Sequence, residues 1–121
     1  MSDVLVKQLV KKYRKGDIIF KENTIGNEMY IIQSGKVQIS KRSGDKDVVL
    51  EILGEKAFFG EMCLFSDKTR TADAMALENS NLIVITKNML DMQLRNVPSW
   101  FVTMFKALVG RLEKANKRIN K

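Results

Sequence analysis

Short apolar runs separated by turn residues fill most of the chain before Thr86. These runs are rich in β-branched and aromatic residues and lie at 18–20, 29–32, 37–39, 48–53, 71–77 and 81–85. Gly26-Asn27, Ser34-Gly35 and Ser43-Gly44-Asp45, which lie between consecutive runs, are typical of tight turns. Closely spaced short strands of this kind predict a sandwich, roll or barrel.

A helical spacing of apolar residues replaces this pattern at both ends of the chain. Val4 to Lys12 favours a short helix that ends before Gly16. Residues 88–95 predict another short helix, and Pro98 suits the first turn of a longer one. The apolar positions of that longer helix recur at spacings of four and three residues, at Phe101, Phe105, Leu108, Leu112, Ala115 and Ile119. The chain is therefore predicted to be mainly β with flanking helices (α+β), and its last helix carries an apolar seam.

The length of 121 residues suits one domain. We expect that domain to span 1–121, with an N-terminal helix in 1–15, a β-roll in 16–86 and C-terminal helices in 87–121. Hydrophobic residues make up 45% of the chain, which is enough to build a packed core.

Histidine is absent from the sequence. This absence excludes Ser-His-Asp hydrolases, Cys-His proteases and most zinc and non-haem iron sites. Carboxylate-only or lysine-based chemistry passes this test, but no other feature of the chain supports it. We therefore expect no catalytic residues, no metal site and no enzyme activity.

The net charge is +7, and basic residues gather in 7–15 and 111–121. A basic chain can bind nucleic acid or an anionic membrane, but no DNA-reading helix pair or RNA-binding aromatic motif accompanies the charge. We interpret the two clusters as solvated faces. A single cysteine indicates a disulfide-free chain in the reducing cytoplasm. No signal peptide is visible, and no apolar run approaches the roughly 20 residues that cross a bilayer.

The segment Phe58 to Leu64, followed by Arg70-Thr71-Ala72, carries the candidate chemistry. Gly60 allows close approach of the backbone, and the residues after it suggest a helical turn whose N–H groups face an anion. Arg70 enters an apolar strand, so its guanidinium should be partly desolvated and need an anionic partner, such as a phosphate. Glu61 is then free to accept hydrogen bonds from hydroxyls such as those of a ribose.

These motifs resemble the phosphate-binding cassette of the cyclic nucleotide-binding domain family, here spanning 59–72. The family includes bacterial catabolite-activator proteins, regulatory subunits of cyclic-nucleotide-dependent kinases and cyclic-nucleotide-gated channels. The resemblance covers nearly the whole chain, since the segments at 16–20 and 30–37 match the early strands and 88–121 matches the B and C helices. It implies a double-stranded β-helix, or jelly-roll, with cAMP or cGMP as ligand.

The resemblance also implies roles for individual residues. Gly60 offers close backbone approach, Glu61 binds the ribose 2′-hydroxyl, and Arg70 pairs with the cyclic phosphate. The backbone of Met62 and Cys63 contributes at the short cassette helix, with the Cys63 N–H near the phosphate. The hydroxyl of Thr71 is implied to contact the phosphate or a purine. On the last helix, we expect the amide of Asn116 to serve as the contact with the base.

Several positions depart from the family pattern. Asn23 and Lys56 stand where the family usually has glycine, Ala57 replaces an acidic residue, and Thr69 replaces a proline that often precedes the arginine. None of these removes a ligand contact, although the turn at 55–57 is expected to differ. In bacterial activators a Thr-Ser pair of the last helix reaches the purine, and here Ala115-Asn116 occupies its place.

We expect a cyclic-nucleotide receptor that relays binding through its C-terminal helix to an unidentified partner protein or to the second subunit of a homodimer. The alternative is a ligand-free β-roll that acts as a protein-interaction module. The sequence contains no helix-turn-helix after its last helix, so we expect no DNA-binding domain. We read the start at Met1 and the basic end as those of a complete small protein.

Overall fold

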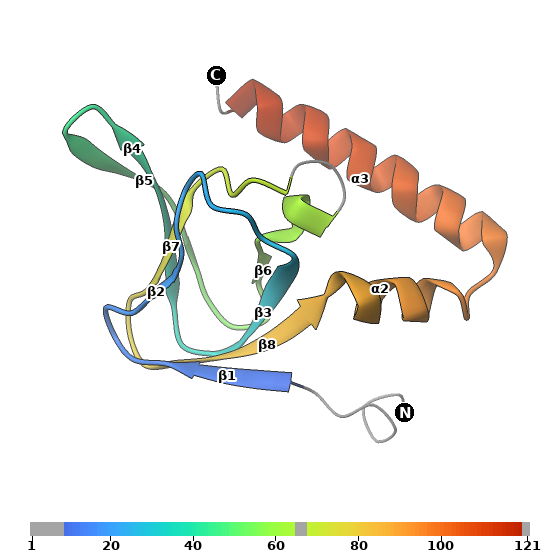
Figure 1. The fold of residues 1–121 in the computed structure, drawn as a ribbon, viewed down its shortest axis with the longest axis horizontal. Helices are drawn as coiled ribbons and strands as arrows, with labels where there is room; N and C mark the ends of the chain where they lie inside the picture. The colour runs from blue at the N-terminus through green and yellow to red at the C-terminus, as the bar shows by residue number, and fades with distance from the viewer. Residues whose placement is uncertain (1–8, 65–67, 120–121) are drawn as a thin grey trace. The chain divides into compact units, whose positions relative to one another are not determined.

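The computed structural model describes residues 9–64 and 68–119, with side chains there except those of 113 and 116–119. The chain divides into two compact units, 1–86 and 87–121. In the part that the structure describes, the first unit consists of β-strands and a short 3₁₀ helix, and the second consists of two α-helices (Figure 1).

The strands of the first unit follow the predicted apolar runs. In the described residues they are β1 (Leu9–Tyr13), β2 (Ile18–Phe20), β3 (Glu28–Ser34), β4 (Val37–Ser43), β5 (Lys46–Leu53), β6 (Phe58–Phe59), β7 (Asp73–Ala76) and β8 (Ser80–Thr86), with the 3₁₀ helix η1 (Glu61–Leu64) after β6. They form two antiparallel sheets, of order β1-β8-β3-β6 and β2-β7-β4-β5. The predicted turn at Gly44 is confirmed: Ser43 pairs with Lys46, and Gly44 has a φ of +63°.

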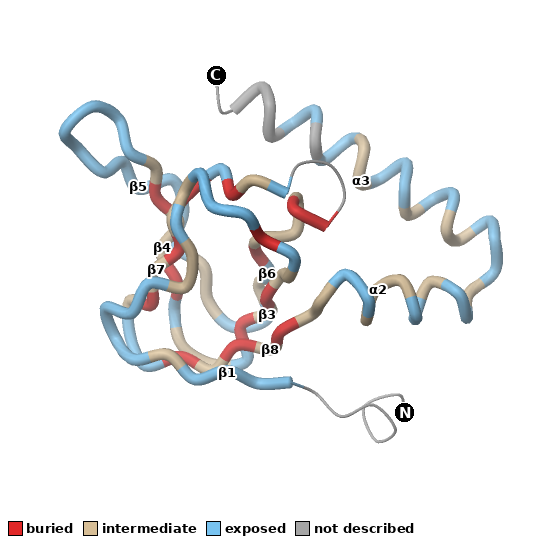
Figure 2. Tube along the Cα trace, viewed as in Figure 1, coloured by how far each residue is buried: buried red, intermediate tan, exposed pale blue. Residues whose placement is uncertain are grey.

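Side chains from both sheets form one hydrophobic core. Its buried members are Tyr30, Ile32, Val37, Phe59, Ala74, Leu82 and Val84. Every second residue along much of β3 and β8 is buried, because successive side chains of a strand point to opposite faces (Figure 2). The prediction of a mainly β roll with C-terminal helices is confirmed.

The prediction of an N-terminal helix is wrong for the part of that segment that the structure describes. Leu9 to Tyr13 form strand β1, which pairs antiparallel with β8 from Leu9↔Val84 to Tyr13↔Ser80. This pairing satisfies the backbone groups along one edge of β8, a gain from tertiary structure that local helical spacing does not reveal. Residues 1–8, which contain the rest of the predicted helix, lie outside the described residues.

Strand β6 was not among the predicted strands. Phe58 and Phe59 pair with Ile31 and Tyr30 of β3. This places the start of the predicted cassette beside the first sheet. The strand predicted over 71–77 is shorter, because β7 begins at Asp73. Arg70 therefore lies in the connection that leads into β7.

Both predicted C-terminal helices are present, as α2 (Lys87–Leu94) and α3 (Ser99–Ile119). The Pro98 carbonyl accepts hydrogen bonds from the N–H groups of Phe101 at 3.0 Å and Val102 at 3.3 Å. Proline thus begins the long helix, as predicted. Within the described residues, neither helix combines the length and apolar character that crossing a bilayer requires.

Candidate functional site

The predicted cassette begins where β6 ends, at Gly60. This residue has a φ of +77°, a conformation that L-residues rarely adopt. A Cβ atom there would lie 2.8 Å from Nη1 of Arg70 and 3.2 Å from the ring of Phe20. Backbone conformation and space both require glycine, and the close approach that the sequence predicts at Gly60 is made to the Arg70 side chain.

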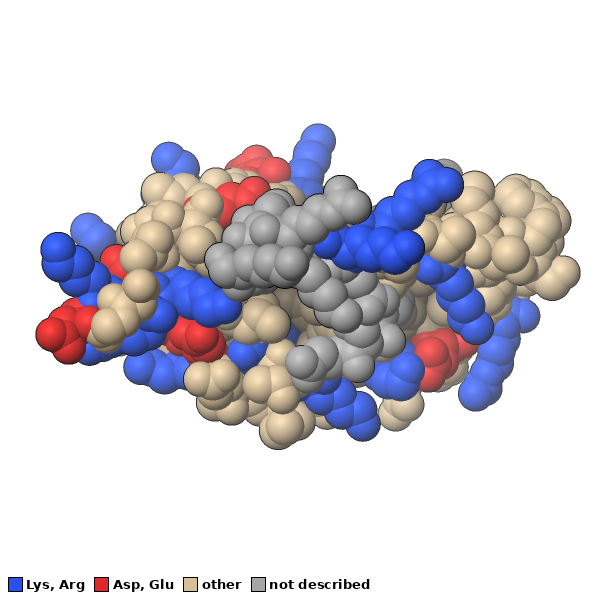
Figure 3. All heavy atoms as spheres, turned by 90° about the horizontal axis from the view of Figure 1, so that it is seen from above, with Lys and Arg blue, Asp and Glu red and all other residues tan. Residues whose placement is uncertain are grey.

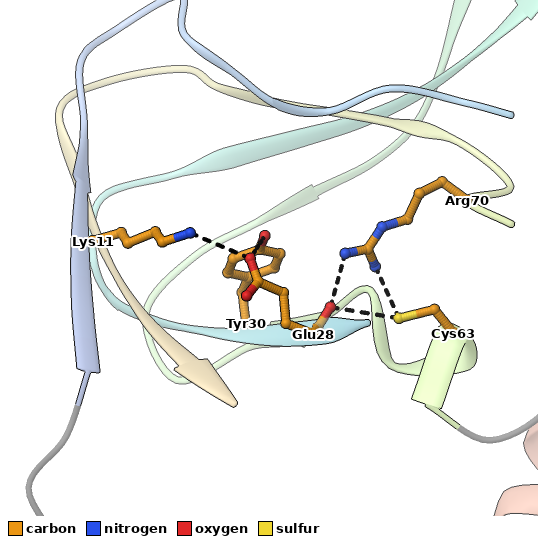
Figure 4. Close-up of polar contacts among 5 residues, drawn as sticks. All are labelled: Lys11, Glu28, Tyr30, Cys63 and Arg70. Atoms are coloured by element: carbon orange, nitrogen blue, oxygen red, sulfur yellow. Dashed lines mark hydrogen bonds and ion pairs between the residues drawn. The ribbon is translucent and has the colours of Figure 1, made fainter. Parts of the chain in front are cut away.

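Arg70 is buried, with 5% of its surface exposed. Its Nη1 donates to the Gly60 carbonyl at 3.0 Å. The same nitrogen contacts the Cys63 sulfur at 3.2 Å, and Nη2 donates to the Glu28 carbonyl at 2.8 Å (Figure 4). Its own backbone is held by Thr24, whose carbonyl accepts from the Arg70 N–H at 2.7 Å. The guanidinium is therefore held between β3 and η1.

Phe20 and Gly26 hold the guanidinium in place. The Arg70 Cζ lies 4.0 Å from the centroid of the Phe20 ring, a cation–π contact. A Cβ added to Gly26 would meet Arg70 Nε at 2.2 Å and Cζ at 2.3 Å. Sequence reasoning identified Gly26 only as part of a turn and Phe20 only as part of a strand. Their contact with Arg70 joins segments that are distant along the chain, and no local pattern signals it.

The positive charge of Arg70 meets carbonyl dipoles and an aromatic ring rather than a carboxylate. Among the described residues, ion pairs join Lys11 to Glu28 and Arg42 to Asp47, and no carboxylate lies within ion-pair distance of Arg70. A buried cation without an anionic partner is unfavourable unless a ligand supplies the negative charge. The site is thus electrostatically suited to a small anion.

Glu61 begins η1 and is partly buried. Burial raises the pKa of its carboxyl group above the ordinary value, and the negative charge of Glu51 raises it further. A hydrogen bond from its own backbone N–H and the positive charge of Arg70 act in the opposite direction. Glu61 and Arg70 thus interact electrostatically across one site.

Cys63 fills the space between η1 and β3. Its thiol donates to the Gly60 carbonyl at 3.1 Å and lies 3.5 Å from the Glu28 carbonyl. Burial is the largest influence on this thiol and raises its pKa, although the charge of Arg70 opposes the shift. A buried thiol of raised pKa has the character of a packing group rather than of a nucleophile.

The carbonyl of Glu28 that holds Arg70 belongs to a small polar network. The Glu28 carboxylate accepts from the Tyr30 hydroxyl at 2.6 Å and from the Lys11 ammonium at 3.4 Å (Figure 4). Burial, and next the hydrogen bond to Glu28, raise the pKa of Tyr30, so its phenol stays protonated and donates. The network links β1 to the part of β3 that holds Arg70.

The other predicted site residues are placed less centrally. Met62 is partly buried in η1, and Thr71, directly after Arg70, is exposed. Asn116 belongs to α3, but its side chain lies outside the described residues. The structure thus brings Gly60, Cys63 and Arg70 into direct contact, and it places Glu61 where its charge interacts with that of Arg70.

Asn23 and Lys56 explain how the chain tolerates two departures from the family pattern. Their φ angles are +67° and +71°, so both residues adopt the left-handed conformation that glycine adopts most easily. Asn23 donates its N–H to the Arg70 carbonyl at 2.8 Å, and Lys56 donates its N–H to the Ile32 carbonyl at 2.8 Å. The backbone of the turn at 55–57 therefore keeps a glycine-like conformation with lysine at its centre.

The chain has a net charge of +7, and its basic side chains do not form a single patch on the face shown in Figure 3. Figure 3 shows Lys and Arg side chains spread over the face, with Asp and Glu side chains between some of them. A nucleic-acid interface concentrates positive charge on one face or along one helix. The interpretation of the two basic clusters as solvated faces stays a prediction.

Curated relatives match this chain over nearly its whole length. It is 29% identical over 117 residues to the CRP-like cAMP-activated global transcriptional regulator of Mycobacterium tuberculosis, covering 95% of this chain and 52% of that protein. It is 29% identical over 118 residues to the potassium/sodium hyperpolarization-activated cyclic nucleotide-gated channel 2 of Mus musculus, covering 98% of this chain and 13% of the channel. The chain spans about half the length of the bacterial regulators it matches.

A solved structure, that of the EAL enzyme Bd1971, has the same fold in one part of its chain. Its cAMP-bound form matches with a TM-score of 0.72 and 32% identity, over 92% of this chain and 30% of that one. Its cGMP-bound form matches with a TM-score of 0.75 and 30% identity, over 91% and 30% of the two chains. The sequence model of the cyclic nucleotide-binding domain matches residues 10–96. The cassette, the strand order and these similarities agree, and the chain belongs to the cyclic nucleotide-binding domain family.

Proposed function

We propose that this domain binds a cyclic nucleoside monophosphate, cAMP or cGMP, with the cyclic phosphate at Arg70. The observation that carries the proposal is a buried guanidinium with no carboxylate partner among the described residues. A cyclic phosphate has one negative charge, which would neutralise this cation without leaving a second charge buried.

Arg70 keeps donor capacity for such a ligand. A guanidinium carries five N–H donors, and among the described residues three contacts use them, to Gly60, Cys63 and Glu28. Donors therefore remain for phosphate oxygens. Because Phe20 and Gly26 fix the side chain in advance, little rotamer entropy is lost when a ligand binds.

The remaining predicted contacts surround this anchor. Glu61 would accept a hydrogen bond from the ribose 2′-hydroxyl, which requires its ionised form. The backbone N–H groups of Met62 and Cys63, in η1, would face the phosphate. The exposed hydroxyl of Thr71, one residue after the arginine, is available to the phosphate or to a purine. Asn116 remains the proposed base contact from α3.

We propose that α3 passes the signal to a partner protein or to a second copy of the chain. Four large apolar side chains lie at four-residue intervals along it and are exposed: Trp100, Met104, Leu108 and Leu112. Residues four apart share one face of a helix, so these side chains form a continuous apolar stripe suited to another helix. Ligand binding would bias a two-state arrangement of this helix.

The role that we propose is regulatory rather than catalytic, and we propose that it operates in the cytoplasm. The similar Mycobacterium regulator is named for activation by cAMP. Its name describes a ligand that controls a larger protein rather than one that is chemically converted. We infer a similar controlling role for the site of this chain.

Titration calorimetry with cAMP and cGMP tests the proposal. We expect the wild-type chain to bind at least one of them, and Arg70→Ala to weaken binding about 10- to 100-fold, from the loss of a charged hydrogen bond worth roughly 1.5–3 kcal/mol. Arg42→Ala is the matched control, because Arg42 is an exposed arginine paired with Asp47. Equal affinities of wild type and Arg70→Ala would rule out the cassette assignment. Binding of neither nucleotide would favour a ligand-free interaction module.

A further inference from the structure

Glu51 lies on the inner face of the second sheet. One row of paired residues crosses this sheet: Phe20 pairs with Ala74, Ala74 with Ile39, and Ile39 with Glu51. Paired residues share a face of a sheet. Because Ala74 belongs to the core and Phe20 and Ile39 pack against it, Glu51 has the inward-facing position on β5. Its neighbour on the same face, Leu53, also packs against the core.

Arg70 and Glu51 lie at opposite ends of this row. The guanidinium sits over the Phe20 ring at one end, on β2. Glu51 is at the other end, on β5, with its surface exposed. Three strand spacings separate β2 from β5, about 14–15 Å at 4.7–4.9 Å each. The inner face therefore offers a cation at one end and a carboxylate at the other.

The negative charge of Glu51 acts on Glu61, where it contributes to the raised pKa of the carboxyl group. Among the described residues, neither carboxylate forms an ion pair. A ligand held at Arg70 can offset the repulsion between these two carboxylates by presenting a hydrogen-bond donor to each. The ribose 2′-hydroxyl is one such donor, and the base can supply the second.

We propose that Glu51 is a specificity-determining residue that binds the base and selects guanine over adenine. Guanine presents two adjacent donors, N1–H and the N2 amino group, which match the two oxygens of a carboxylate. Adenine presents an amino group next to the unprotonated N1, whose lone pair a carboxylate repels. The inference rests on the proposed function, because it assumes that the phosphate occupies Arg70.

Competition binding with three cyclic nucleotides tests this role. The probes are cGMP, cIMP, which keeps N1–H but lacks the amino group, and cAMP. We expect the wild-type chain to bind cGMP most tightly and cAMP least tightly. In Glu51→Gln and Glu51→Ala the preference for cGMP over cAMP should fall by about 5- to 150-fold, the discrimination that a bidentate contact provides between bases. Affinity for cAMP should change less than about threefold.

Glu78→Gln is the matched control, because Glu78 is an exposed glutamate in the turn between β7 and β8. It removes the same charge and should leave the nucleotide preference unchanged. A wild-type preference for cAMP, or a cGMP-to-cAMP ratio that is the same in both Glu51 variants as in wild type, would overturn the role of Glu51 while leaving the proposed function intact. If wild type binds none of the three probes, the proposed function fails, and the role of Glu51 fails with it.

Discussion

Gly26 offers the sharpest test of how the fold holds Arg70. In Gly26→Ala the added Cβ would lie 2.2 Å from Nε and 2.3 Å from Cζ of Arg70, whereas ordinary contacts begin at 3.4 Å. The guanidinium must therefore move by about 1.2 Å to restore an ordinary contact. Gly26 is outside the left-handed region, so alanine adds no backbone strain at this position.

A displacement of this size breaks the anchor while leaving most of the fold in place. The bonds from Arg70 to the carbonyls of Glu28 and Gly60, at 2.8 Å and 3.0 Å, cannot both survive it. The displaced guanidinium also no longer lies where the phosphate would meet it, and losing one charged hydrogen bond to the ligand corresponds to about 1.5–3 kcal/mol, or about 10- to 100-fold in affinity. Because a charged hydrogen bond to a carbonyl is lost as well, we expect the free energy of unfolding to fall by about 1.5–3 kcal/mol, partly offset because alanine restricts the unfolded chain more than glycine.

Calorimetric titration of Gly26→Ala, Arg70→Ala and the double variant forms a complete cycle. If Gly26 acts through Arg70, the double variant should bind no more weakly than Arg70→Ala alone. Gly54→Ala is the control, because a Cβ at Gly54 meets no atom within 4 Å. The reasoning is refuted if Gly26→Ala binds like wild type, or if it further weakens a chain that already lacks Arg70.

Four other predictions concern the same site and the last helix. Glu61→Ala should abolish discrimination between ribose and 2′-deoxyribose ligands, and an unchanged preference in a competition assay would contradict the ribose role. Because burial raises the pKa of Glu61 and ligand binding requires its ionised form, affinity should fall as pH drops below that raised pKa, by up to tenfold per pH unit, and Glu61→Gln should remove this dependence. The sign reverses for stability without ligand: the contribution of Glu61 to the free energy of unfolding is fully present below the ordinary pKa of 4.5 and is lost as pH rises through the raised value, which urea titrations of wild type and Glu61→Gln across pH would detect as a difference between them. Leu112→Lys should convert a dimer to monomers by light scattering, and a monomeric wild type would exclude pairing through α3.

Much of the architecture is determined locally, and the sequence is sufficient for those parts. Alternating and β-branched runs predict most of the strands, because each strand must bury one face. Gly44 and Asp45 in the turn between β4 and β5 predict a hairpin, because a two-residue turn requires a positive φ that glycine adopts easily. The apolar residues after Pro98 predict α3, because their spacing of three and four residues places them on one face of a helix.

Tertiary structure alone decided the contacts that join distant segments. Residues 9–12 have a pattern that suits a helix, but they form β1 because β8 offers an edge to pair with. Arg70 was predicted to be desolvated, yet its actual partners, Phe20, Gly26 and the Glu28 carbonyl, come from segments far away in the chain. The inward position of Glu51 likewise follows from strand register, which packing sets and local composition does not. A residue type shows which chemistry is available, and the pairing of strands determines which groups meet.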